Sequence, residues 1–573
     1  MKYIINKIYI ILFLLAILLI ESKALAKKSE IKYTKENISH YFSGIISANR
    51  DYNTEQAFKH LKKVQSLKNV HSNFNIEFLR TLVLLEKFNE SFSFSKSIWN
   101  KEKFVFEADL LLGIEAFIKK DYSSAEKYFL RINEISPYNF YFENFLSSNL
   151  LAWTKAVNNN KQASFELLEN IPKPYHHLKK TQKVFLQCYF EDDKTQLSFK
   201  ELIENKNYNF SRYNFFFANY FIFKNENGAA KKVIENGRKK YNSNLLLRQI
   251  EEFLTKNNIK EIKKLYNCKN PEDSLAELFY IVANLYSSEK DYKLSNFYLK
   301  ISLFLNSNFL PNKALLAENL YFQKKNTLSK KVYKSLKSIG STYSWYADKS
   351  ISNILLMEEG FERAASNLEK EFSLISNPNY EHHYELANFY KRNEFYEKSI
   401  KYYSLALNEI NRDNSLYPKI LDRRGTSYER IDKWKKAEKD LMESLELSPD
   451  QPHVLNYLAY SWIDKGINLD KGLEMLKKAT QLKQNDGYII DSLGWAYYAK
   501  KNYAEAEKFL QRAVQILPQD PIINDHYADS LWMLNKEIQA RYFWNYVLNL
   551  SETEEELKEK INKKLIFGIV KKL

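Results

Sequence analysis

The sequence predicts an all-α fold, in which pairs of helices stack one after another into a right-handed superhelical solenoid. Two observations predict it: a helical repeat near the C-terminus and a scarcity of turn-forming residues. The 573-residue chain has only 12 glycines and 11 prolines, too few for the many tight turns of a sheet-rich fold. Its hydrophobic content of 45% excludes wholesale disorder. Long helices joined by short polar loops fit this composition.

The repeat is clearest in residues 487–520. Small residues stand at position 8 (Gly494) and position 20 (Ala506), where the two helices of a unit would cross closely. A large residue at position 24 (Leu510) fills the gap to the next unit. Pro518 ends the second helix, because proline cannot donate the backbone hydrogen bond that would extend it. The same pattern recurs in units that begin at Pro418, Pro452 and Pro521.

Looser copies of the repeat run back toward the N-terminus. Stretches with weak signatures but of one-repeat length lie between them, at 72–100, 180–206 and 243–266. At ~34 residues per unit, the chain after its leader would hold about fifteen or sixteen helix pairs. We predict divergent repeats over 27–380 and clear repeats over 380–550. The looser copies are anchored by Leu112-Gly113, Ala218, Ala283 and Ala387.

Residues 551–573, at the C-terminal end, have the pattern of a capping helix. They begin with Ser-Glu-Thr-Glu-Glu-Glu and end in lysines, the charge order that a helix dipole favours. Leu557, Ile561 and Leu565 form one apolar stripe. We expect this helix to close the last repeat.

Residues 1–26 have the pattern of a signal peptide. Two lysines precede an apolar run from Ile8 to Ile20, and Ala24-x-Ala26 forms a cleavage site. As a helix the run spans only about 20 Å, short of the ~30 Å hydrocarbon core of a bilayer. We therefore expect cleavage after Ala26 and a periplasmic protein, with peripheral membrane contact at most. The alternative is an uncleaved leader that anchors the chain to the inner membrane.

The only cysteines, Cys188 and Cys268, lie far apart in the sequence. Their spacing suggests neither a disulfide framework nor a metal knuckle. Cys188 lies in the apolar stretch 184–190, and we expect it to be a small core residue.

The formal net charge is +16. Lysines are scattered among glutamates along the predicted helices. The sequence has no basic arm and no recognisable nucleic-acid-binding domain, so nucleic-acid binding is not expected. A basic surface could instead attract an anionic envelope polymer or lipid headgroups. A structural envelope protein with such a ligand is therefore one alternative function.

The repeat resembles the tetratricopeptide repeat (TPR) family. Residues 456–550 are similar to one group of proteobacterial envelope TPR proteins, through the segments 456–464, 486–498 and 520–529. The best-characterised members of that group are outer-membrane lipoproteins that bind and activate a periplasmic carboxy-terminal processing protease. The resemblance implies an extracytoplasmic adaptor, and such a protease is its implied partner. This leader has no lipidation cysteine after its apolar run, which departs from those relatives.

Motifs of enzyme chemistry are missing from the sequence. It has no Gly-rich phosphate loop, no Gly-x-Ser-x-Gly and no His-Glu-x-x-His. Neighbouring helical residues point about 100° apart, so His382 and His383 cannot easily share a metal ion, and His383 falls at a packing position. We predict no catalytic residue, no metal, no cofactor and no small-molecule substrate. The alternative is an enzyme with an unrecognised site in residues 138–270.

The sequence also predicts a protein-binding surface. In TPR arrays the first helix of each unit lines the concave face, chiefly through positions 2, 5, 9 and 12. Aromatic rings beside hydrogen-bond acceptors suit a groove for an extended segment or a partner helix. The acidic residues at position 5 have a second interpretation, because in a first turn they complement the helix dipole. Positions 5, 9 and 12 of the clear units supply Asp422, Asn456, Tyr460, Asp491, Trp495, Tyr498, Asp525, Asp529 and Trp532.

Overall fold

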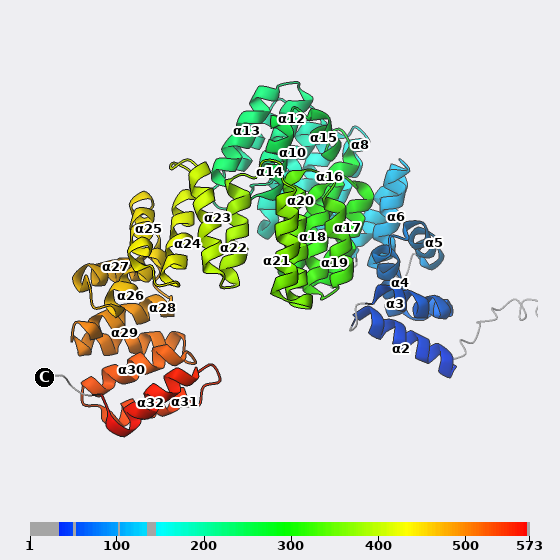
Figure 1. The fold of residues 1–573 in the computed structure, drawn as a ribbon. Helices are drawn as coiled ribbons and strands as arrows, with labels where there is room; N and C mark the ends of the chain where they lie inside the picture. Colours follow the sequence, from blue (N-terminus) through cyan, green and yellow to red (C-terminus); the bar gives the residue numbers. More distant parts are fainter. Residues whose placement is uncertain (1–33, 50–52, 101–103, 135–144, 570–573) are drawn as a thin grey trace, which may run out of the picture. The chain divides into compact units, whose positions relative to one another are not determined.

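The protein is all-α, as the sequence predicts (Figure 1). The computed structural model describes residues 34–49, 53–100, 104–134 and 145–569, and within these ranges it contains no strand. The predicted leader, residues 1–26, lies outside the described residues. None of the described helices is long and apolar enough to cross a membrane.

The chain forms two compact units, Met1–Ala364 (unit 1) and Ala365–Leu573 (unit 2). The boundary falls inside α21 (Phe361–Ser373). The first half of unit 1 contains α2 (Lys35–Asn49), α3 (Thr54–Leu61), the 3-10 helix η1 (Lys62–Asn69), α4 (Ser72–Leu84), α5 (Phe88–Ile98), α6 (Phe106–Ile118), α7 (Tyr122–Glu134), α8 (Phe145–Val157), α9 (Lys161–Glu169), the 3-10 helix η3 (Lys173–Tyr175) and α10 (His176–Tyr189).

The remaining helices of both units follow the same alternation of helix and short loop. Unit 1 continues with α11 (Thr195–Glu204), α12 (Tyr213–Phe223), α13 (Asn227–Lys240), α14 (Leu245–Thr255), α15 (Ile259–Leu265), α16 (Pro271–Ser288), α17 (Tyr292–Leu305), α18 (Leu310–Phe322), α19 (Asn326–Leu336) and α20 (Ser341–Glu359). Unit 2 contains α22 (Tyr380–Arg392), α23 (Tyr396–Glu409), α24 (Tyr417–Glu429), α25 (Trp434–Leu447), α26 (Pro452–Asp464), α27 (Leu469–Leu482), α28 (Gly487–Ala499), α29 (Tyr503–Ile516), α30 (Pro521–Met533), α31 (Glu537–Leu548) and α32 (Glu555–Phe567).

Helices α2–α31 follow one another as fifteen pairs, and α32 follows the last pair. For the described part of the chain, this number of pairs agrees with the prediction. The stretches with weak signatures are also helix pairs: 72–100 holds α4 and α5, 180–206 holds most of α10 and all of α11, and 243–266 holds α14 and α15. Helical periodicity therefore identified repeats even where the signature residues were missing.

The predicted register of the clear repeats agrees with the packing of their helices. Gly494 on α28 lies against Leu510 on α29, so closely that a Cβ atom on Gly494 would come within 2.6 Å of the Leu510 Cγ. Ala506 and Ala513 are fully buried on the same helix as Leu510. The two helices can approach this closely only because position 8 has no side chain.

Replacing Gly494 with leucine is expected to destabilise unit 2 by ~1–3 kcal/mol, because the added side chain overpacks the helix crossing. The midpoint of urea unfolding, followed by circular dichroism, measures the loss. The control is Gly228→Leu at the start of α13, where a Cβ atom would meet no heavy atom within 4 Å. An unchanged midpoint for the Gly494 variant would contradict the register.

The turn within each clear pair has a left-handed residue at position 15 of the unit. The following residue donates its backbone N–H to the carbonyl five positions earlier, as from Asn502 to Tyr497 (2.9 Å) and from Lys536 to Leu531 (2.9 Å). This is the Schellman arrangement that satisfies the last carbonyls of a helix. Most of these residues are not glycine, so the packing of the helices imposes this turn at a cost of about 1–2 kcal/mol for each of them. The residues at position 15 are Glu394, Asp432, Gly466, Lys501 and Asn535.

Unit 1 contains contacts between helices far apart in sequence. Helix α16 packs against α8 and α10, and α17 packs against α4. Lys293 at the start of α17 lies 2.7 Å from the Glu77 carboxylate on α4, and the rings of Phe88 and Phe304 are stacked with centroids 4.0 Å apart. Unit 1 therefore folds back on itself, beyond the neighbour-to-neighbour stacking of a simple solenoid.

A carboxylate from α14 caps the start of α20. Glu252 accepts hydrogen bonds from the backbone N–H groups of Ser341 and Thr342, each at 3.1 Å, and pairs with Lys256 at 2.7 Å. Burial opposes its ionisation, but these donors outweigh burial and lower the pKa of Glu252 to about 2. The cap joins two helices that are far apart in the sequence.

A depressed carboxyl pKa contributes stability above the pKa of the unfolded chain, and this stability is lost as the pH falls toward the folded value. Because the pKa falls from 4.5 to about 2, we expect the partly solvated Glu252 to contribute roughly 2–3 kcal/mol at pH 7. Glu252→Gln should remove most of this contribution at pH 7 and little of it at pH 2. Urea unfolding at both pH values measures the difference. An equal loss in the free energy of unfolding at both pH values would contradict a stabilising role for the Glu252 charge.

Cys188 and Cys268 form a disulfide bond, so the interpretation that their spacing suggests no disulfide was wrong. Cys188 is buried near the end of α10, as predicted for a core residue, and Cys268 lies in the loop before α16. Their Cα atoms are 5.9 Å apart. The spacing of the two cysteines could not indicate the bond, because spacing along the chain says nothing about a contact made by folding back.

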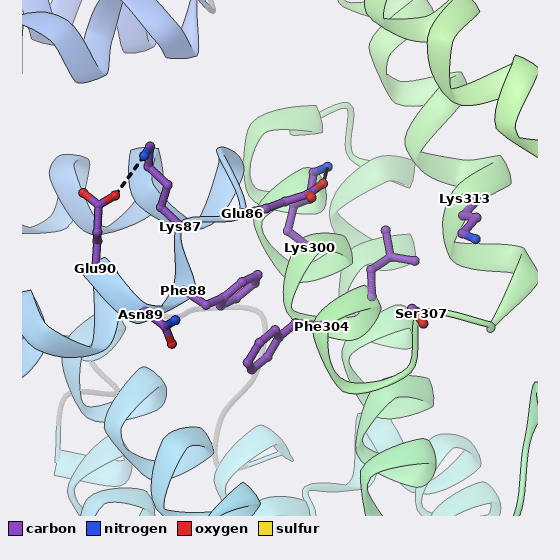
Figure 2. A pocket seen from close by; sticks show the side chains of 10 residues that line it. Glu86, Lys87, Phe88, Asn89, Glu90, Lys300, Phe304, Ser307 and Lys313 are labelled. Carbon is purple, nitrogen blue, oxygen red and sulfur yellow. Dashed lines mark hydrogen bonds and ion pairs between the residues drawn. The ribbon is translucent and has the colours of Figure 1, made fainter.

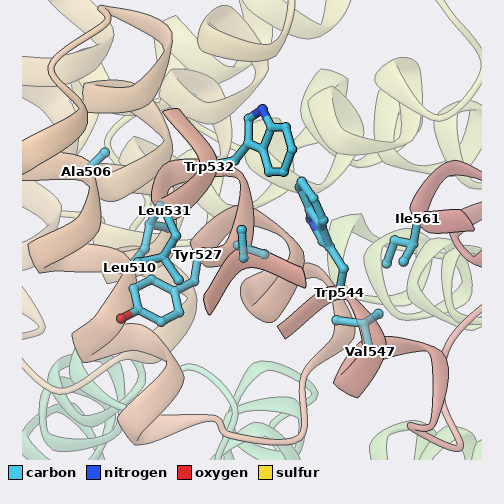
Figure 3. Packing of buried hydrophobic residues seen from close by; sticks show 10 residues of the cluster. Ala506, Leu510, Tyr527, Leu531, Trp532, Trp544, Val547 and Ile561 are labelled. Carbon is cyan, nitrogen blue, oxygen red and sulfur yellow. The ribbon is translucent and has the colours of Figure 1, made fainter. Parts of the chain in front are cut away.

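Residues Glu555–Phe567 form α32, at the place where the sequence predicts a capping helix. Ile561 is fully buried, and Leu557 and Leu565 pack against the same cluster. Figure 3 shows Trp544 between Trp532 and Ile561. Helix α32 thus covers apolar side chains of α30 and α31.

Candidate protein-interaction groove

The nine predicted binding residues lie on α24, α26, α28 and α30, the first helices of four successive pairs in unit 2 (Figure 1). A cavity of about 540 Å³ lies along these helices. Of the predicted residues, Asn456, Tyr460 and Asp491 line it. The other six predicted residues do not line the cavity.

Two apolar side chains that the prediction missed also line the cavity. Tyr488 is 59% exposed and Ile522 is 46% exposed. Both stand at position 2 of their units, at the start of α28 and α30. Exposed large apolar side chains gathered around one cavity indicate a binding surface. We call the surface formed by Asn456, Tyr460, Tyr488, Asp491 and Ile522 the groove.

The rim of the groove is more acidic than the chain as a whole. Four carboxylates line the cavity, against the two basic side chains Arg430 and Lys465. Glu429 accepts a hydrogen bond from the Tyr457 hydroxyl at 2.6 Å. Hydrogen-bond acceptors beside aromatic rings suit a polypeptide segment that brings N–H donors and apolar side chains. The four carboxylates belong to Glu429, Asp464, Asp491 and Asp520.

Asp491 also belongs to a buried stack beside the cavity. Its carboxylate lies 3.0 Å from the Nδ1 atom of His526. The ring of Trp495 is stacked on His526 at 4.0 Å and on Tyr498 at 4.6 Å. Burial opposes the charged imidazolium, but the Asp491 carboxylate, helped by Asp525 and Asp529, outweighs burial and raises the pKa of His526. Trp495 and Tyr498 are thus half-buried in this stack and do not line the cavity.

Helix α32 and the residues after it contact the three predicted residues of the last repeat. The Lys564 ammonium lies 2.7 Å from both the Asp525 and the Asp529 carboxylates. The Trp532 indole donates to the Ile569 carbonyl at 3.1 Å. The chain's own C-terminal segment thus contacts all three side chains of α30 that were predicted to bind a partner.

Asp422, at the other end of the predicted column, lies among basic side chains. Burial raises its pKa, against the opposing effect of Lys391 and Arg423. Lys391 donates a hydrogen bond to the Thr426 hydroxyl, and burial lowers the pKa of Lys391 to about 8. Lys391 and Arg423 therefore offset part of the cost of burying the Asp422 charge.

Among the described residues, no group of three His, Cys, Asp or Glu side chains is arranged to hold a metal ion. His383 is buried at its predicted packing position and lies 3.2 Å from the Glu409 carboxylate. His382 instead completes the capping box of α22 with Asn379. The two histidines therefore have separate structural roles.

Comparison with known proteins identifies the repeat. Residues 489–520 match the tetratricopeptide repeat family. A segment of 174 residues is 29% identical to a TPR repeat-containing protein of Pseudomonas aeruginosa, and it covers 30% of this chain and 28% of that protein. The chain thus matches little more than a quarter of that relative's length.

Similar solved structures include a tetratricopeptide repeat protein from Parabacteroides merdae, with 20% identity and a TM-score of 0.34 over 39% of this chain and 88% of that one. Another is the Cut9–Hcn1 hetero-tetramer of the APC/C, with 13% identity and a TM-score of 0.37 over 94% of this chain and 98% of that one. The family match at residues 489–520, together with the repeat register seen in the helix packing, identifies tetratricopeptide repeats in the C-terminal part of the chain.

Proposed function

We propose that this protein is an extracytoplasmic scaffold that binds a segment of a partner protein in the groove of unit 2. The observation that carries the proposal is the cavity of about 540 Å³ in which exposed Tyr488 and Ile522 stand beside carboxylates. TPR folds are in general interaction scaffolds without catalytic activity. A groove with apolar anchors and polar acceptors fits that use.

Two features support a location outside the cytoplasm. The sequence of residues 1–26 has the pattern of a signal peptide. The Cys188–Cys268 disulfide is typical of oxidising compartments such as the periplasm. N-terminal sequencing of the protein from the envelope fraction should begin at Lys27 with Lys-Lys-Ser-Glu. Recovery of chains that begin at Met1 in the membrane pellet would contradict cleavage.

The resemblance of residues 456–550 to envelope adaptors makes a carboxy-terminal processing protease the first partner to test. In this proposal the protein binds the protease and brings it to its substrates or activates it. Purified protease from the same organism should bind the intact chain and not a variant in which the groove is changed.

The test uses Tyr460→Ala combined with Tyr488→Ala. We expect the affinity for a partner captured from envelope extract, or for the purified protease, to fall at least tenfold, because aromatic rings in such a groove supply much of the apolar contact area. The matched control is Tyr542→Ala on α31, because Tyr542 is 67% exposed and lies outside the groove. Equal binding by both variants, with unchanged melting temperatures, would overturn the assignment of the groove.

A further inference from the structure

A second large cavity lies entirely within unit 1. It has a volume of about 790 Å³ and lies between the α3 and α4 region and helices α17–α20. These are the two regions that meet where unit 1 folds back on itself, as in the pair of Lys293 with Glu77. The cavity therefore exists only because segments far apart in the sequence lie side by side.

One side of this cavity is aliphatic. The side chains come from α4, α18 and α19 and the residue after α4, and they range from buried Leu316 to Leu328, which is 50% exposed. None of the described residues that line the cavity is aromatic. Such a wall suits the aliphatic chain of a ligand. The six aliphatic residues are Leu84, Leu85, Leu316, Leu320, Leu328 and Val332.

The same cavity has a basic rim. Four lysines line it, together with three carboxylates. Two of the carboxylates are already paired: Glu86 with Lys300, which is one of the four lysines, and Glu358 with Lys330, which is not a lining residue. The lining therefore has one more basic than acidic side chain. Lys324 and Lys331 are exposed at the rim. The four lysines are Lys300, Lys324, Lys325 and Lys331.

The first turn of α19 faces the same cavity through Asn326, Thr327 and Leu328. The helix has no side-chain cap at its start. The N–H groups of a first turn carry partial positive charge and suit an anionic group. They add to the charge of the lysine rim.

The cavity adjoins another one of about 630 Å³, and Glu86 and Lys300 line both. Figure 2 shows the stacked rings of Phe88 and Phe304 beside the Glu86–Lys300 pair, with Lys313 on the opposite side. Burial lowers the pKa of Lys313, and burial with the neighbouring Lys293 lowers the pKa of Lys325 to about 8. An anion bound at the lysine rim would favour the charged form of Lys325.

We propose that the cavity between the α3 and α4 region and α17–α20 binds an anionic amphiphile, a molecule with a phosphate or carboxylate group and one aliphatic chain. The aliphatic wall holds the chain, and the lysine rim with the first turn of α19 holds the anionic group. This goes beyond the proposed function, because the site belongs to unit 1 and does not depend on the groove.

The test is isothermal titration of the intact, delipidated, disulfide-bonded chain with probes below their critical micelle concentrations. Lysophosphatidylglycerol represents a phosphate group and oleate a carboxylate group. The probe that binds more tightly identifies which anionic group the ligand carries. We expect one of them to bind with one-to-one stoichiometry. Zwitterionic lysophosphatidylcholine and neutral monoolein should bind at least tenfold more weakly, and inorganic phosphate at least a hundredfold more weakly.

Two variants assign the binding to the cavity. Lys324→Glu with Lys331→Glu changes only exposed side chains, and Leu328→Asp changes the half-exposed part of the aliphatic wall. Each variant should lower the affinity for the anionic amphiphile at least tenfold without changing the melting temperature. The matched control is Lys435→Glu with Lys439→Glu on α25, which makes the same change in net charge at exposed lysines of unit 2.

Other results would overturn the proposal. An equal loss of affinity in the control variant would mean that the amphiphile adsorbs to the protein through net charge alone. Binding of inorganic phosphate as tight as that of the amphiphile would mean that the aliphatic wall is not used. Binding that begins only above the critical micelle concentration would mean association with micelles, and unchanged affinity in both cavity variants would place the ligand elsewhere.

Discussion

Replacing both Cys188 and Cys268 with alanine is expected to lower the free energy of unfolding of unit 1 by about 4 kcal/mol. The two cysteines have a sequence separation of 80, and a loop of this length restricts the unfolded chain strongly when it is closed. The loop includes α11–α15 and ends just before α16. Without the bond, the turn that returns the chain from α15 to α10 must be held by packing alone.

Urea unfolding followed by circular dichroism measures this loss. Unit 2 contains no cysteine, so its transition is an internal control that should not move. Both sulfur-bearing side chains are buried, and a reductant should therefore act on the wild type only as unit 1 unfolds. An alanine variant that unfolds at the same urea concentration as the oxidised wild type would show that the bond does not stabilise unit 1.

Removing the buried carboxylate of α16 should have an effect of similar size. Glu277 is fully buried, and its Oε1 atom accepts hydrogen bonds from the Arg212 guanidinium and from the Tyr213 hydroxyl at 3.0 Å. Glu277→Ala leaves the Arg212 charge without this partner beside the Tyr280 ring. We expect a loss of about 3–5 kcal/mol in the free energy of unfolding of unit 1.

The double variant Arg212→Leu with Glu277→Leu separates the cost of the lone charge from the value of the pair. It should be less destabilised than Glu277→Ala, because two apolar side chains replace a buried ion pair and no charge is left unpaired. Urea unfolding of the wild type, the single and the double variant gives the comparison. A double variant that is less stable than the single one would mean that the pair itself stabilises unit 1.

The candidate groove was predicted only in part from the sequence. Repeat positions pointed to Asn456, Tyr460 and Asp491, which line the cavity, because these positions depend on the local periodicity of one helix. The same reasoning could not show that Lys564 pairs with Asp525 and Asp529, since α32 lies outside the repeat pattern. The exposed apolar residues at position 2 could have been found, because that position was expected to face the groove.

The sequence by itself determined the all-α fold, the register of the clear repeats and the helix that follows the last of them. Each of these depends on residues within about 34 positions of one another, where apolar spacing and small residues directly decide how neighbouring helices pack. Gly494 against Leu510 is such a contact. Sequence patterns therefore predicted the contacts between residues that are close together in the chain.

Only the tertiary structure decided how unit 1 folds back on itself, that its two cysteines pair and where cavities remain. The Cys188–Cys268 bond, the Lys293–Glu77 pair and the cavity lined by lysines all join segments that are far apart in the sequence. Such contacts depend on small rotations that accumulate from one helix pair to the next, and no short stretch of sequence encodes their sum. The left-handed turn residues have a related cause, because the packing of whole helices imposes backbone geometry on residues such as Lys501.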